Sequence, residues 1–161
     1  MVTWNSPRTW LAGEDPAASV YNAHIRDNFK AIGDAWTAYT PTWATSGTAP
    51  SLGNGSLTGA YTQAGKHVTF RLRFVPGSTT TFGTGNFSFT YPATAIATSI
   101  AGISGSIFRS GPTYFGIIVV GLGTTTFRMI GTSGNALVTG TSPLTFTNAD
   151  ELSIAGDYEA A

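Results

Sequence analysis

The sequence predicts a mainly β protein, an antiparallel β-sandwich or jelly roll preceded by one N-terminal amphipathic α-helix. Roughly eight short apolar segments are separated by turn residues about every 8–12 positions, which is typical of antiparallel sandwiches. Residues 67–75 alternate strictly between apolar and polar, as a half-buried strand does. Only residues 15–36 read as a long helix. We therefore expect an arm and helix over 1–37, for anchoring and oligomerisation, and a β body over 38–161.

The helix is predicted from its start signals and its apolar spacing. Asp15 is a favourable N-cap, and Pro16 suits the first helical position, where its missing N–H costs nothing. The expected seam consists of Ala18, Asn22, Ile25, Phe29, Ile32 and Trp36. The alternating spacing of four and three residues places these side chains in one narrow row, as in a coiled coil. A polar residue in such a row, here Asn22, can fix register and copy number.

The seam has two interpretations. The helix can pack against the β body of its own chain, or it can join copies of the chain. The preceding arm contains Trp4 and Trp10, which are costly to leave in water. They can pack on their own chain, or they can dock on a neighbouring subunit or another structural protein.

The β body is predicted strand by strand. Residues 39–43 form a first extended segment, with Pro41 at an edge or a strand start. Residues 57–63 and 67–75 form a hairpin whose second arm turns its apolar side chains to one face and its polar ones to the other. Further strands are expected at 86–91, 100–108, 113–120, 124–130 and 152–158, with an apolar stretch at 144–146. The run 115–120 is the most apolar and therefore the expected central strand.

The strand pattern also raises a charge question. Arg71 and Arg73 alternate outward on one strand, as Asp157 and Glu159 do on the last. If the two strands are neighbours, these residues can form a cross-strand charge ladder. Alternatively, the arginines face another subunit or an anionic ligand. Loops 46–55, 76–85 and 131–143 are the expected contact loops, since binding residues are concentrated on loops of rigid scaffolds.

Composition narrows the function classes. The chain has 161 residues, only 10% of them charged, with no cysteine and a net charge of zero. All acidic residues lie near the two ends, and the five basic residues between 35 and 149 are too scattered for a nucleic-acid groove. The chain has no apolar run long enough to indicate insertion into a membrane. We expect no nucleic-acid partner, no membrane insertion and no disulfide.

Catalytic and metal chemistry are not indicated. The central region has no carboxylate for acid–base catalysis, and of the two histidines His24 lies in the helix and His67 begins a strand with no acid nearby. Zinc and calcium would need more ligands than any local segment offers. We therefore predict no catalytic residue, no metal site and no cofactor, and expect a protein that is not an enzyme.

Three segments together resemble a known family. They are residues 9–28 (TWLAGE through NAHIRDN), residues 36–68 (WTAYTPTW through GAYTQAGKHV) and residues 150–160 (DELSIAGDYEA). This set resembles small tail or minor tail proteins of tailed phages of actinobacteria. The resemblance implies a virion protein, a homotrimer with a helical stem and β heads, attached to other virion proteins through its N-terminus. It implies no catalytic residues.

Our expectation is a virion structural protein, a trimeric short tail fibre or receptor-binding protein that contacts a host surface glycan or other virion proteins without catalysis. In it Trp4 and Trp10 would dock on the virion. A capsid decoration or head-fibre protein would have the same anatomy. A carbohydrate-binding module is an alternative from another class, and it needs an exposed aromatic platform, for which Trp43, Tyr61 and Tyr114 are the candidates.

Overall fold

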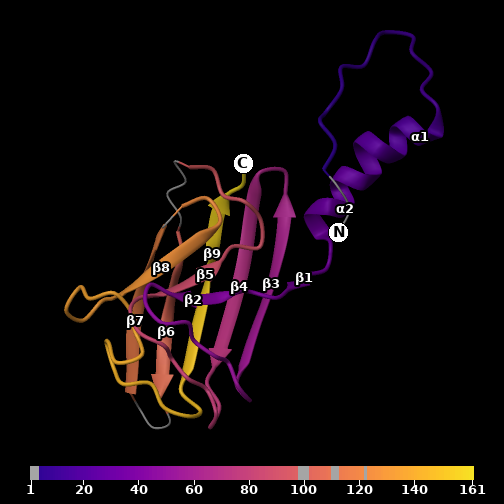
Figure 1. Cartoon of the computed structure of the whole chain (residues 1–161). Helices are drawn as coiled ribbons and strands as arrows, with labels where there is room; N and C mark the ends of the chain where they lie inside the picture. Colours follow the sequence, from indigo (N-terminus) through magenta and orange to yellow (C-terminus); the bar gives the residue numbers. More distant parts are fainter. Residues whose placement is uncertain (1–3, 98–101, 110–112, 122) are drawn as a thin grey trace.

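The computed structural model describes residues 4–97, 102–109, 113–121 and 123–161, and for 113, 114 and 121 only the backbone. Its β body is one antiparallel sheet that curls on itself, with a short helix at the N-terminal end (Figure 1). The sheet has nine described strands in the order β1-β3-β4-β9-β6-β7-β8-β5-β2. The mainly β, sandwich-like class predicted from the sequence is therefore confirmed, although its layers belong to a single sheet.

The elements have the following bounds. The helix consists of α1 (Ala18–Tyr21), a π-helical turn η1 (Asn22–Arg26) and α2 (Asp27–Gly33). The strands are β1 (Thr37–Tyr39), β2 (Trp43–Thr45), β3 (Ser56–Ala64), β4 (His67–Val75), β5 (Phe87–Thr90), β6 (Ser104–Arg109), β7 (Thr113–Gly121), β8 (Thr126–Gly131) and β9 (Glu151–Glu159). The stretch 144–146 is irregular rather than a strand, but its side chains Leu144 and Phe146 are buried in the core.

Alternation along the strands builds the core. On β4, Val68, Phe70, Leu72 and Phe74 are at most 2% exposed, while the intervening residues face outward. β8 follows the same pattern, with Phe127 and Met129 fully buried. Burying these side chains stabilises the fold by about 1.5–3 kcal/mol each. The core therefore lies inside the curl of the sheet, and the polar positions form its outer face.

The helix begins later than the sequence predicted. Its N-cap is Ala17, in an extended conformation (φ −59°, ψ 151°), and no side chain caps the first turn. The prediction of Asp15 as N-cap and Pro16 as first helical residue is therefore wrong. The chain ahead of Ala17 instead forms a local turn, in which the Glu14 carboxylate accepts a hydrogen bond from the Leu11 amide at 3.1 Å. The helix also ends at Gly33, which leaves Trp36 beyond it.

The predicted charge ladder is also corrected. β4 and β9 are neighbours, but the register places Arg71 opposite Ala155 and Arg73 opposite Ser153. Arg73 instead forms an ion pair with Glu151, with 2.5 Å between Nη2 and Oε2. The sequence pattern allowed β4 and β9 to be neighbours, but it did not determine their register, which depends on where the adjoining turns end.

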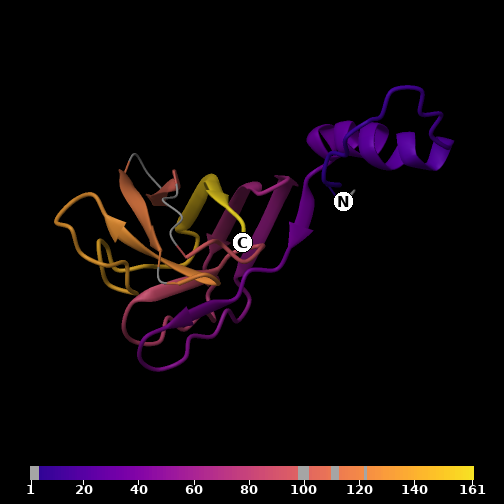
Figure 2. The same cartoon turned by 90° about the horizontal axis from the view of Figure 1, so that it is seen from above.

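The helix and the predicted contact loops lie at opposite ends of the sheet. The β3–β4 hairpin turns between Ala64 and His67 at the helix end, while Ser56 and Val75 pair at the far end. Loops 46–55, 76–85 and 131–143 all connect strands at that far end, as the pairings of β2, β5, β7 and β8 require. Figure 2 shows the helix projecting from the sheet rather than lying flat on it.

Candidate functional site

The N-terminal helix exposes a row of large apolar side chains. Ile25 is 42% exposed, Phe29 72%, Ile32 62% and Trp36 43%. Of the ten large hydrophobic side chains exposed in the described part of the chain, eight lie within residues 4–36. Contiguous exposed apolar surface on a soluble protein marks an interaction site. The seam of the isolated chain is therefore not covered by its own β body.

The π-helical turn changes which residues belong to this row. The predicted seam assumed α-helical geometry throughout, but Asn22–Arg26 has the wider i→i+5 turn. A wider turn moves residue i−3 out of line and leaves residue i−4 near it, so Tyr21, which is 45% exposed, precedes Ile25 in the row. Asn22 is half-buried at the start of the π turn, and Ala18 is exposed one turn earlier. Tyr21 was missed because a π turn has no signal in apolar spacing.

The other side of the helix is covered by the N-terminal arm. Asn28, 8% exposed, accepts a hydrogen bond from the Asn5 backbone amide at 2.8 Å and donates one to the Asn5 carbonyl at 2.9 Å. The Asn5 side chain donates to the carbonyl of Ala23 at 3.0 Å. His24 lies beside the same segment, with 3.1 Å between Nδ1 and the Ser6 carbonyl. These contacts hold the arm on one face and leave the apolar row open on another.

The two arm tryptophans have different surroundings. Trp10 stacks on Tyr21 with ring centroids 5.4 Å apart, and the Arg8 guanidinium lies 4.8 Å from the Trp10 ring centroid. Trp4 lies near the Gly65 turn of the β3–β4 hairpin. Trp4 remains 38% exposed and Trp10 40%. Trp10 thereby extends the apolar surface of the helix beyond Tyr21.

Two of the far-end loops are joined into one surface. The Asn54 carboxamide oxygen accepts from the Thr79 amide at 3.0 Å and from the Thr79 hydroxyl at 2.9 Å. Thr48 donates its amide to the Thr84 hydroxyl at 2.9 Å, and a backbone bridge links Ser51 with Thr81. Loops 46–55 and 76–85 therefore form a single polar surface at the end farthest from the helix.

The candidate aromatic platform is not assembled by Trp43 and Tyr61. The Trp43 ring packs against Phe74 and Phe87, with centroids 4.7 and 5.1 Å away, and its indole nitrogen is buried without a hydrogen-bond partner. Tyr61 also packs against the core. A glycan platform needs exposed ring faces, and these two rings are occupied by protein contacts. The side chain of Tyr114 lies outside the described residues.

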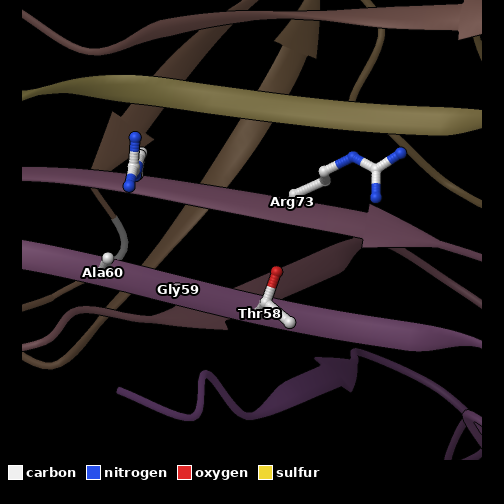
Figure 3. Close-up of a pocket in the computed structure, with 5 residues that line it drawn as sticks. Thr58, Gly59, Ala60 and Arg73 are labelled. Atoms are coloured by element: carbon white, nitrogen blue, oxygen red, sulfur yellow. The ribbon is translucent and has the colours of Figure 1, made fainter. Parts of the chain in front are cut away.

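The outer face of the sheet has a shallow depression of about 250 Å³ lined by Thr58, Gly59, Ala60, Arg71 and Arg73. Figure 3 shows Thr58, Gly59 and Ala60 in a row along β3, with Arg73 opposite Thr58 on the neighbouring strand β4. Arg71 contacts Trp36, whose ring centroid is 4.8 Å from the guanidinium carbon. The end of the apolar row therefore rests on this face of the sheet.

Ionisable groups in the described residues are arranged in pairs rather than in a catalytic cluster. Asp150 accepts hydrogen bonds from Arg109 and Thr147, and Glu151 accepts from Arg73 and Ser153. No group of three or more His, Cys, Asp or Glu side chains suited to a metal ion occurs within the described ranges. Nor does that part of the chain include a helix long and apolar enough to span a membrane.

The candidate functional site therefore consists of two surfaces. One is the exposed apolar row of the helix, and the other is the polar loop surface at the opposite end of the sheet. Comparisons of the chain with protein-family models, with curated proteins and with solved structures find no match.

Proposed function

We propose that the protein is a non-catalytic structural protein of a phage virion, a short tail fibre or receptor-binding protein that assembles, as a homotrimer, through its N-terminal helix. The exposed row of Tyr21, Ile25, Phe29, Ile32 and Trp36 carries this proposal. Helices that present such a row bury it by packing against equivalent helices. The resemblance to actinobacterial phage tail proteins supports the virion setting.

The two ends of the molecule have separate roles in this proposal. The helix and arm gather copies and attach them to other virion proteins, with Trp4 and Trp10 available for docking. The joined loops 46–55 and 76–85, at the opposite end, are mostly exposed and rich in residues with hydroxyl and amide groups. Such groups suit contact with a polar host surface, including surface glycans.

The assembly role is tested by light scattering of the purified full chain and of Phe29→Ser. Phe29 is 72% exposed, so the substitution removes apolar contact area between copies without opening the core of the chain. We expect the full chain to be a trimer and the variant to dissociate at least tenfold more readily. Lys30→Ser, the neighbouring exposed position, is the matched control and should stay assembled.

The virion role needs a separate experiment. Antibodies raised against the β body should label one defined location of the virion in electron microscopy. Labelling at the tail tip supports a fibre or receptor-binding role, whereas labelling spread over the capsid would favour a decoration protein. Unlabelled virions would contradict the proposal.

A further inference from the structure

The connection between helix and sheet restricts how assembled copies can sit. Only residues 34–36 lie between the end of α2 at Gly33 and the start of β1 at Thr37. Three residues span at most about 11 Å. Helices packed through an apolar row lie about 8–10 Å apart. If the row joins copies, as proposed above, this short connection holds their β bodies close to one another.

The structure also indicates which face of the β body meets the neighbour. Trp36 is the last residue of the apolar row, and its ring rests on Arg71, an outward residue of β4. From Arg71 the register defines a row of outward neighbours across the sheet. That row contains Ala60, Arg71, Ala155, Ser104, Ile118 and Ile130. The apolar surface of the helix is therefore continuous with the outer face of the sheet.

This outer face has an apolar part and a recessed part. Ile118 is 53% exposed and Val120 40%, and they are the large hydrophobic side chains exposed in the described β body. Beside them lies a second shallow depression, of about 440 Å³, whose outward lining residues include Ser104, Ser106, Ser153 and Ala155. Small side chains leave room there for larger ones from another molecule. Ile118 and Val120 of one copy can therefore fit into the recess of a second copy.

The apolar part carries the cation Arg128, and the recessed part carries the anion Asp157 as well as Arg71. Arg128 lies opposite Val120 across the β7–β8 pair, and Asp157 lies two residues beyond Ala155 on β9. Within the described ranges, neither side chain forms an ion pair. β6 and β7 separate their strands, so they cannot meet within one chain. Across an interface between copies, they can.

We propose that Ile118, Val120 and Arg128 of one copy pack on the Arg71, Ala155 and Asp157 surface of a second copy of this chain. This interface rests on the proposed assembly through the helix and extends it to the β bodies. In the homotrimer proposed above, this contact between two different patches repeats head-to-tail around a closed ring.

Engineered cysteines test the interface directly, because the chain has no cysteine of its own. The variant Ile118→Cys with Ala155→Cys places both thiols on the outer face. Within one chain β6 separates these strands, so their backbones lie about 9–10 Å apart, beyond the roughly 7 Å limit for a disulfide. Oxidation should give covalent dimers and larger species on a non-reducing gel. Each single variant, and the control pair Ser133→Cys with Asn148→Cys on the far-end loops, should stay mostly monomeric on the gel.

A charge exchange provides the second measurement. Arg128→Asp should weaken association at least tenfold, and adding Asp157→Arg to the same chain should restore it. If the full chain assembles but neither cross-links nor responds to the exchange, the proposed sheet interface is wrong and the helix assembly stands. A monomeric full chain would overturn both.

Discussion

Asp150 is held by Arg109 in the one ion pair of the described chain in which a partner is fully buried. The Asp150 side chain is 2% exposed, and its two carboxylate oxygens accept from Arg109 Nε at 3.1 Å and Nη2 at 2.9 Å. The Thr147 amide donates to the same carboxylate at 2.7 Å. This contact fixes the turn that leads into β9, since Glu151 is the first residue of that strand.

The first prediction concerns pH. Burial alone would raise the pKa of Asp150, but the hydrogen bonds from Arg109 and Thr147 outweigh it and lower the pKa below its usual value of 3.8. The charged carboxylate therefore stabilises the folded chain above that value, and the contribution is lost as the pH falls through the lowered pKa. Urea unfolding at neutral pH should show Asp150→Asn destabilised by about 1–3 kcal/mol. The difference should shrink at acidic pH, and the exposed Asp15→Asn should behave like the parent chain throughout.

The second prediction separates the core from the apolar row. Phe70 is fully buried and contacts Tyr91, Phe127 and Tyr158. Phe70→Ala should lower the free energy of unfolding by about 3–5 kcal/mol, because it leaves a cavity among these rings. Phe29→Ala removes a ring of the same size from an exposed position and should leave the unfolding of dissociated chains nearly unchanged. Equal losses in chemical denaturation of dilute protein would contradict the exposed position of Phe29.

The third prediction uses the π-helical turn. Tyr21 lies in the apolar row, whereas Asn22 begins the turn and is half-buried. Tyr21→Ser should weaken self-association measured by sedimentation, and Asn22→Ser should leave the copy number unchanged. If Asn22→Ser changes the copy number and Tyr21→Ser does not weaken self-association, Asn22 belongs to the seam, as α-helical spacing predicts.

The fourth prediction concerns the arm. Asn28→Ala removes both hydrogen bonds that join Asn28 to Asn5. The arm should then leave the helix more often, and trypsin should cleave after Arg8 several times faster, as mass spectrometry can measure. Asn148→Ala on an exposed far-end loop is the control, for which the cleavage rate should not change.

Much of the β body could be predicted from sequence because its strands bury one face. Alternation identified β4, β5 and β8, and it separated the buried apolar side chains of β4 from its outward polar ones correctly. The register between β4 and β9 could not be predicted, because Arg71 and Arg73 fit the same alternation in any pairing that keeps their side chains outward. In the structure Arg73 pairs with Glu151 rather than with Asp157.

The candidate site was predicted in part for similar reasons. The exposure of Ile25, Phe29 and Ile32 agrees with a row that faces away from the β body. Trp43 was a candidate for an exposed ring, yet it packs against Phe74 and Phe87, which come from distant parts of the chain. Neither these long-range ring contacts nor the π turn, which moves Asn22 out of line with Ile25, is visible in the local sequence.

The hydrogen bonds of Asn54 with Thr79, and of Thr48 with Thr84, have a consequence for how this protein can vary. Because loops 46–55 and 76–85 hold each other in place, a substitution at one of these positions disturbs the other loop as well. New recognition properties would then arise through matched pairs of changes in the two loops.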